Sequence, residues 1–247
     1  MARLSVNLNK VALLRNSRHT GVPDVVAFAR MVLDAGAHGL TVHPRPDERH
    51  IRRTDVTALA KLLGSLRPRP EFNVEGYPDQ RLRDIATEIR PEQITLVPDA
   101  PGAFTSDKGW DLTEDERRIA LPAIAAHKAL GARVILFVDP DPAVIARVRD
   151  AGADGIEIYT GAYAEASRSN THAALLDACA ATAEAAHAAG LVVNAGHDLN
   201  RLNLPALVAR LPNLAEASIG HELTADALAI GFPAAVRAYV AALAGSH

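Results

Sequence analysis

The stretch "DAGAHGLTV", residues 34–42, has the pattern of a helix end, a glycine turn and a buried strand. Gly36 stands where helices commonly stop, and the run that follows is apolar and short. A near copy, "DAGADGIEI", occupies residues 150–158, about half a chain away. Repeated units of helix, turn and strand indicate a fold of alternating helices and parallel strands.

Eight short apolar runs rich in β-branched residues recur along the chain, and each is too short for a stable helix. They lie at residues 3–8, 39–43, 71–76, 93–98, 133–138, 155–160, 191–196 and 216–220. Helical spacing is found between them, near residues 23–35, 54–66, 78–90, 114–130, 141–151, 171–189, 203–210 and 224–243. This alternation predicts an α/β fold with one domain over residues 1–247, a (β/α)8 TIM barrel with eight parallel strands and additional short helices.

A Rossmann or flavodoxin-like sheet is the structural alternative. Such a sheet normally carries a G-x-G-x-x-G turn after its first strand, and "NLNKVALLRNSRHTG", residues 7–21, contains none. The half-chain spacing of the two near copies fits two half-barrels, although a helix, a glycine turn and a strand also form a common local unit.

Composition excludes several classes of protein. The net charge of -3 and the pI near 6.4 give no broad basic surface for nucleic acid. The single cysteine, Cys179, allows neither a disulfide framework nor a cysteine metal site. Neither a signal peptide nor an apolar run of about 18 residues is found, so no membrane association and a cytoplasmic location are expected.

Polar residues follow six of the eight predicted strands. In TIM barrels the chemistry lies on the loops after the carboxyl ends of the strands, so these side chains are expected to converge. The residues are Asn7, Asn9, Lys10, Arg15 and Arg18; His43, Arg45 and His50; Asn73 and Glu75; Glu157 and Thr160; Asn194, Gly196 and His197; and Gly220 and His221.

Two groups of these residues predict anion sites. The turns in "NAGHDLN", residues 194–200, and "SIGHEL", residues 218–223, lead toward helices and are suited to hold a phosphate. Arg45 and His50, after the second strand, are suited to hold another. Two anion sites suggest two phosphorylated substrates.

Acid and base groups lie between the two anion sites. His43, Glu75, Glu157 and His197 are suited to amine addition, dehydration and enolisation. The alternatives are a hydrogen bond to a backbone carbonyl for a single histidine and an ion pair with an arginine or Lys10 for the carboxylates. Other residues are expected to be structural or solvated, namely His38, Arg49, Arg52, Arg53, Trp110, His127 and His187.

Taken together, the motifs resemble the pyridoxine 5'-phosphate synthase family, whose barrel enzymes close the pyridine ring in the deoxyxylulose-phosphate-dependent route to vitamin B6. The resemblance covers nearly the whole chain. Its motifs are "VNLNKVALLRNSR", "DAGAHGLTVHPRPDERHI", "NVEGY", "LVPD", "FTSDKGWDL", "IEIYTGAYA", "VNAGHDLN" and "SIGHEL", in that order.

The resemblance implies condensation of 3-amino-2-oxopropyl phosphate with 1-deoxy-D-xylulose 5-phosphate, without metal or organic cofactor, in a homo-oligomer, an octamer in the family. It implies that His43 and Glu75 accept protons, that His197 donates one, and that Glu157 stabilises a transition state. The implied aminoketone site is Asn7, Arg18, Asp198, Gly220 and His221. The implied ketose site is Asn9, Lys10, Arg45, His50 and Thr105. The loop 99–110 is expected to act as a lid.

The chain departs from the familiar family form at several positions. That form has Asp-His at Asn9-Lys10, a histidine at Tyr159, a cysteine at Ala162 and a glycine at Asp198. The first change bears on ketose binding. Two functional alternatives stay open, a metal-dependent hydrolase or epimerase with His43, Glu75, His197 and His221 as ligands, and a barrel that binds phosphorylated metabolites without catalysis.

Overall fold

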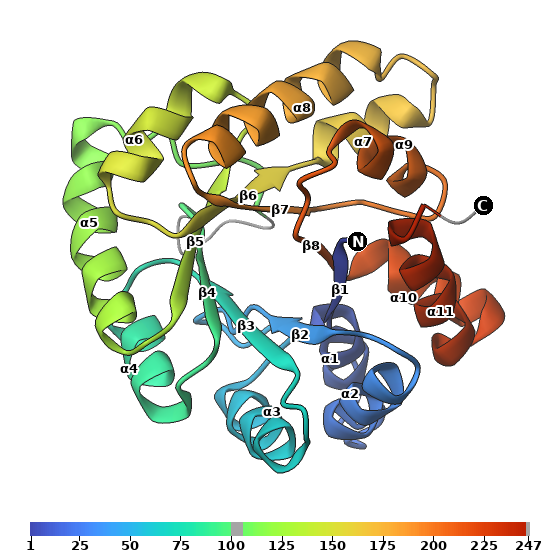
Figure 1. Ribbon diagram of the computed structural model, residues 1–247. Coiled ribbons are helices and arrows are strands. Elements are labelled where there is room, and N and C mark those ends of the chain that lie inside the picture. Colours follow the sequence, from blue (N-terminus) through green and yellow to red (C-terminus); the bar gives the residue numbers. More distant parts are fainter. Residues whose placement is uncertain (100–105, 246–247) are drawn as a thin grey trace.

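A computed structural model, which describes residues 1–99 and 106–245, has a closed barrel of eight parallel strands ordered β1 to β8 (Figure 1). The strands are β1 (Arg3–Asn7), β2 (Gly39–Val42), β3 (Glu71–Gly76), β4 (Gln93–Leu96), β5 (Arg133–Val138), β6 (Gly155–Tyr159), β7 (Val192–Gly196) and β8 (Glu216–Ile219). Each coincides with one of the eight predicted apolar runs. The prediction of a TIM barrel is therefore confirmed.

Helices surround the barrel (Figure 1). They are α1 (Asn9–Asn16), α2 (Val25–Asp34), α3 (Arg53–Ser65), α4 (Gln80–Ile89), α5 (Glu114–Ala129), α6 (Ile145–Asp150), α7 (Gly161–Ser167), α8 (Ala173–Ala188), α9 (Leu204–Arg210), α10 (His221–Ile230) and α11 (Phe232–Leu243). Within the described ranges, no helix is both long enough and apolar enough to cross a membrane.

Two expectations about helices were wrong. The segment after β1 was expected to be a loop, but Asn9–Asn16 forms α1, which buries Val11, Ala12 and Arg15. The segment 224–243 was expected to be one helix, but it is divided into α10 and α11 at Gly231. Gly231 has φ 82°, a left-handed conformation that ends α10 and that glycine adopts at little cost.

Residues assigned structural roles contact the scaffold as expected. Trp110 is 2 % exposed, and its Nε1 donates a hydrogen bond to the Leu96 carbonyl at 2.9 Å. The Nδ1 of His38 accepts a hydrogen bond from the Leu4 N–H at 3.1 Å. His127 is buried at the end of α5.

The barrel interior is polar, whereas TIM barrels are commonly filled with branched apolar side chains. Ser5 and Thr41 share a hydrogen bond of 2.7 Å, and Thr95 donates to Asn73 at 3.1 Å. The apolar core lies instead between the strands and the surrounding helices, and includes Leu4, Leu40, Phe72, Ile94, Leu136, Ile156, Val193 and Ala217. The interior is therefore suited to hold ionisable groups.

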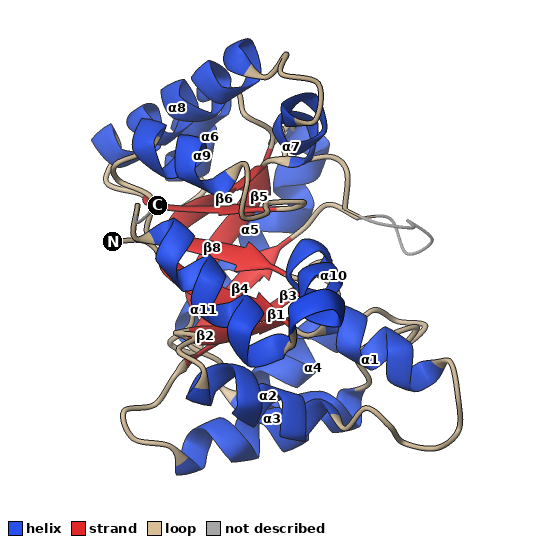
Figure 2. Ribbon diagram, turned by 90° about the vertical axis from the view of Figure 1, so that its right-hand side faces the viewer, coloured by secondary structure: helices blue, strands red, loops and turns tan. Residues whose placement is uncertain are grey.

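A charged network joins the first residues of β1, β3, β5 and β8. Figure 2 shows α1, α7 and α10 at the other end of the strands. Arg3 contacts Glu71 at 3.0 Å and Glu216 at 3.6 Å. Arg133 pairs with Glu71, and Gln93 Nε2 lies 3.5 Å from Glu216 Oε1. Glu216 is only 1 % exposed, so its charge depends on these partners.

We expect Glu216→Gln to weaken the pH dependence of stability. Burial raises the pKa of Glu216 to about 7, Glu71 adds to the rise, and Arg3 and Arg133 offset part of it. An unfolded glutamate titrates near pH 4.3, so the native state binds more protons between about pH 4.3 and 7, and stability falls as pH rises through this window. Between pH 5 and 8 the wild type should lose free energy of unfolding, and the substitution should reduce this loss by about 1–3 kcal/mol, measured by urea unfolding.

Exposed Glu165 on α7 offers the matched control. Glu165→Gln should retain the pH dependence of the wild type. A Glu216→Gln variant with the same slope as the wild type would show that this carboxyl does not titrate in the window.

Candidate active site

A cavity of about 400 Å³ opens at the carboxyl ends of the strands, and its volume is in the range of small-molecule sites. Fourteen residues were predicted to have a catalytic or substrate-binding role, and twelve of them line the cavity. They are Asn7, Asn9, Lys10, His43, Arg45, His50, Glu75, Glu157, His197, Asp198, Gly220 and His221. Arg18 lies exposed beyond α1 and is not among the lining residues. Thr105 lies outside the described residues, as does part of the loop 99–110.

Six further residues line the cavity without having been predicted as site residues. They are Leu13, Arg49, Val97, Ser106, Phe137 and Ser218. Arg49 was expected to be solvated, but it lies at the cavity and pairs with Asp47 at 2.7 Å. Ser218 could have been found from strand periodicity, because it lies two residues before Gly220 and alternate strand residues share a face.

His43 and Glu75 form a close acid and base pair. Their Nδ1 and Oε2 atoms lie 3.8 Å apart, and the two side chains are 7 % and 12 % exposed. Burial lowers the pKa of His43 well below its usual value, and the positive charge of Arg45 is the next largest cause. Burial, aided by Asp99, raises the pKa of Glu75 to about 7. The distance between the two side chains alone allows an ion pair. The lowered pKa of His43 and the raised pKa of Glu75 both favour a neutral imidazole, which can accept a proton.

Asn9 positions His43. Asn9 begins α1, and its Oδ1 accepts a hydrogen bond of 2.9 Å from the His43 N–H. The Asn9 N–H in turn donates to Asn7 Oδ1 at 2.9 Å. The end of β1 and the start of α1 therefore fix the end of β2.

Glu157 is a buried carboxyl group on β6. It is 4 % exposed, and its Oε2 has no hydrogen-bond partner within the described part of the chain. Burial raises its pKa well above the usual value, and nearby Glu75 and Glu216 add to the rise. The raised pKa favours the protonated form of Glu157, which can donate a hydrogen bond or a proton.

His197 lies in a strained turn after β7. His197 has φ 88° and Asp198 has φ 57°, which are left-handed conformations unusual for residues other than glycine. The Thr160 Oγ1 lies 2.6 Å from the Gly196 carbonyl oxygen and 2.7 Å from that of His197, and so holds the turn. His197 Nδ1 lies 3.1 Å from Asp198 Oδ2, and this hydrogen bond lowers the pKa of Asp198.

Two groups suited to bind anions lie on the two sides of the β1 end, one after β2 and one after β8. After β2, Arg45 Nη2 contacts Asp99 Oδ2 at 2.6 Å, and Ser106 also donates to this oxygen at 2.6 Å. After β8, Gly220 precedes the first residue of α10, His221. A Cβ at Gly220 would lie 3.0 Å from the Asn7 Cβ, so glycine permits the close approach of β8 to β1. The N-terminus of α10 is suited to receive a phosphate.

The metal-site alternative lacks a ligand cluster. Across residues 1–99 and 106–245, no group of three or more His, Cys, Asp or Glu residues is placed to hold a metal ion. His43, Glu75, His197 and His221 all line the cavity but do not form such a group. The cavity instead holds the His43 and Glu75 pair, the buried Glu157 carboxyl group, whose pKa is raised, and His197.

Sequence comparisons give one consistent result. The family model described as pyridoxal phosphate biosynthesis protein PdxJ matches residues 4–245. The chain is 51 % identical over 245 residues to the pyridoxine 5'-phosphate synthase of Brucella suis, covering 99 % of both chains. It is also 51 % identical over 245 residues to the enzyme of that name from Brucella anthropi, covering 98 % of this chain and 99 % of the relative.

More distant solved structures share the fold. A tryptophan synthase chain from M. tuberculosis superposes with a TM-score of 0.67 at 16 % identity, covering 98 % of this chain and 92 % of that chain. Phosphoribosylanthranilate isomerase from Thermotoga maritima superposes with a TM-score of 0.58 at 10 % identity, covering 99 % of this chain and all of that chain. At such identities the likeness extends to the barrel alone.

Proposed function

We propose, on the premise that the chain belongs to the PdxJ family of pyridoxal phosphate biosynthesis proteins, that it condenses 3-amino-2-oxopropyl phosphate with 1-deoxy-D-xylulose 5-phosphate. The products are pyridoxine 5'-phosphate, inorganic phosphate and water. The observation that carries the proposal is the 51 % identity to pyridoxine 5'-phosphate synthase over 99 % of the chain. The cavity supports it, because groups suited to bind anions and acid and base groups line the same space.

Ring closure requires several proton transfers on different faces of one intermediate. The amine condenses with the ketose carbonyl, and a base then removes the proton from the carbon next to the imine. Loss of phosphate, addition of water, ring closure and dehydration follow. We assign proton removal to His43 and Glu75, because a neutral imidazole and a carboxyl of pKa about 7 lie together.

The opposite side of the cavity supplies proton donors. We assign donation to His197, whose position is fixed by the turn at Gly196 and Thr160. Glu157 is suited to stabilise negative charge that develops on a substrate oxygen, since it is buried and its raised pKa favours the protonated form, which can donate a hydrogen bond. No metal or organic cofactor is required by these steps.

The two phosphates are assigned to the two sides of the β1 end, one toward β8 and one toward β2. The aminoketone phosphate would bind near Asn7, Gly220 and His221, at the start of α10. Asp198, on the same side, is suited to pair with the substrate amine. The ketose phosphate would bind near Lys10, Arg45 and His50, all of which line the cavity. The familiar family form has a histidine at Lys10, and a lysine keeps a cationic partner for phosphate there.

The direct test is to incubate the purified protein with both phosphates and to identify pyridoxine 5'-phosphate by its absorbance and mass. Formation of the product with release of inorganic phosphate supports the proposal. Tight binding of both ligands by calorimetry, without release of phosphate, would instead identify a barrel that binds metabolites without catalysis.

We expect kcat/KM to rise with pH through an apparent pKa of about 7. Glu75 accepts a proton only when it is ionised, and burial places its pKa near this value. Activity should therefore be lost as pH falls below 7. Glu75→Gln should remove this limb of the pH profile and lower kcat. The measurement is the rate of the wild type and the variant between pH 5.5 and 8.5 in steps of ~0.5 pH units. An unchanged limb in the variant would assign the titration to another group.

We also propose a homo-oligomer, an octamer by resemblance to the family. Exposed apolar side chains on the described surface support it, since Leu202 is 91 % exposed and Leu228 is 77 % exposed. The Arg201 to Asp226 ion pair joins the two segments that carry them. Light scattering of the purified protein gives the subunit number.

A further inference from the structure

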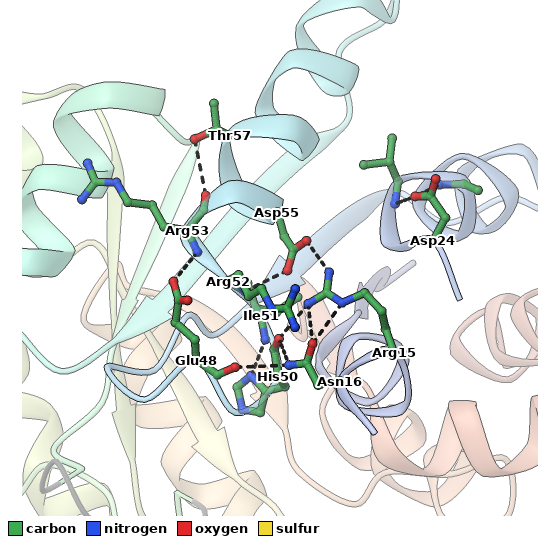
Figure 3. Close-up of polar contacts among 12 residues, drawn as sticks. Arg15, Asn16, Asp24, Glu48, His50, Ile51, Arg52, Arg53, Asp55 and Thr57 are labelled. Carbon is green, nitrogen blue, oxygen red and sulfur yellow. Dashed lines mark hydrogen bonds and ion pairs between the residues drawn. The ribbon is translucent and has the colours of Figure 1, made fainter. Parts of the chain in front are cut away.

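The loop 44–52, which carries Arg45, Arg49 and His50 to the cavity, is held by the end of α1. The side-chain amide of Asn16 lies within hydrogen-bond distance of three successive carbonyl oxygens of this loop. Figure 3 shows Asn16 beside Glu48 and His50. The distances are 3.2 Å to Glu48, 3.1 Å to Arg49 and 2.8 Å to His50. One side chain therefore fixes the backbone of the segment that ends in His50.

Arg15 joins this contact to a second helix. Its Nη2 donates to the His50 carbonyl at 3.1 Å, and its Nε and Nη2 each lie 3.0 Å from Asn16 Oδ1. Its Nη1 pairs with Asp55, which also accepts a hydrogen bond of 2.8 Å from the Arg52 N–H at the start of α3 (Figure 3). Arg15 is 7 % exposed and Asp55 is 9 % exposed. A buried, hydrogen-bonded ion pair therefore ties α1, the loop and α3 together.

The same segment fixes the imidazole of His50. Its Nδ1 accepts a hydrogen bond of 2.9 Å from the Ile51 N–H, so the neutral ring carries its proton on Nε2. Burial, followed by the charges of Arg45, Lys10 and Arg49 and opposed by Asp47, lowers the pKa of His50 to about 4. His50 is therefore a neutral N–H donor at the cavity, beside the cationic groups.

We propose that Arg15 and Asn16 are positioning residues for phosphate binding, which hold the loop 44–52 so that His50 presents its Nε2–H to the phosphate. Neither residue is among those that line the cavity, so both act through His50. The identity of the phosphate as that of the ketose rests on the proposed function. The positioning itself rests on the hydrogen bonds to the loop.

The kinetic test uses Asn16→Ala, which removes the contacts to all three carbonyls, and Arg15→Lys, which keeps the positive charge for Asp55 but loses the planar fork. Each variant should raise KM for the ketose phosphate about tenfold, with kcat and KM for the aminoketone phosphate changed less than about threefold. Arg53→Gln is the matched control. The Arg53 side chain pairs with Glu88 at 2.7 Å. Residue 53 donates its hydrogen bond to loop residue Glu48 from the backbone N–H, which the substitution keeps, so KM should stay at the wild-type value.

A second test does not depend on turnover. Nitrogen-15 spectra of the histidine rings should show His50 of the wild type protonated on Nε2 alone at neutral pH. A titration with inorganic phosphate, followed on the His50 signals, should give roughly tenfold weaker binding in Asn16→Ala and in Arg15→Lys than in Arg53→Gln.

Each outcome bears on one of the two proposals. Unchanged phosphate affinity in both folded variants, or a His50 ring protonated on Nδ1, would overturn the positioning role. A lower melting temperature with unchanged affinity and KM would do the same, because it would mean that the contacts only stabilise the fold. If the wild type forms no pyridoxine 5'-phosphate while the variants still bind phosphate more weakly, the proposed function fails and the positioning role stands.

Discussion

Replacing His43 with asparagine is expected to lower kcat by about 10²- to 10⁴-fold, the usual contribution of a general base. His43 is 6 % exposed at the end of β2, and burial with nearby Arg45 lowers its pKa, so the neutral ring is available at pH 7. Asparagine can form a hydrogen bond there but cannot accept the proton. The measurement is the steady-state rate of pyridoxine 5'-phosphate formation with both substrates saturating.

The control for this substitution is His187→Asn, on the exposed end of α8. It should leave kcat unchanged. Near-normal rates in His43→Asn, and likewise in Glu75→Gln and His197→Asn, would refute the catalytic assignment. Melting curves of each variant separate a loss of chemistry from a loss of folding.

The fold was predictable because its signals are local. Each strand is a short, buried run whose outward face packs against the helices, so that face is apolar whatever the partner strand. The turns at Gly36 and Gly152 have φ 110° and 80°, which explains why the two near copies keep a glycine there. Eight such units over this length leave few arrangements besides a closed barrel.

What the sequence did not predict depends on contacts between distant residues. Asp99 lies 54 residues from Arg45 in the chain, and its contact with that side chain has no signal in residue spacing. The polar interior was also missed, because Ser5, Thr41 and Thr95 lie within runs that are otherwise apolar. Helix α1 was missed because its exposed face carries Leu13 and Leu14, so its pattern is weakly amphipathic.

The site was predicted more completely than its electrostatics. Glycines and histidines after strand ends marked the cavity, but the pKa of a carboxyl depends on its burial and on its neighbours in space. Glu75, Glu157 and Glu216 come from three different strands, yet Glu216 adds to the rise in the pKa of Glu75, and both Glu75 and Glu216 add to the rise in the pKa of Glu157. The polar barrel interior brings them together, and burial there raises the pKa of Glu157 well above its usual value.

Gly196 makes room for this carboxyl. Glu157 and Gly196 occupy neighbouring strands, with Glu157 paired to Asn194 and Tyr159 paired to Gly196 in the register of β6 and β7. A Cβ added at Gly196 would fall well inside the van der Waals distance of Glu157 Oε1, 3.1 Å from its Cδ and 3.4 Å from the Ser218 carbonyl oxygen. Because the strand backbone is fixed by the barrel, the carboxyl group is the part that must move.

We therefore expect Gly196→Ala to lower kcat by about 10²-fold or more, since a displacement of about 1 Å in a catalytic group has this effect. Gly64→Ala on α3 is the matched control, because no atom lies within 4 Å of the added Cβ. It should raise stability by about 0.5–1 kcal/mol through helix propensity and leave kcat unchanged. Rates and urea unfolding of both variants give the comparison. If Gly196→Ala turned over at the wild-type rate, the position of the Glu157 carboxyl would not matter to the reaction, and its assignment as the group that stabilises the developing charge would have to be abandoned.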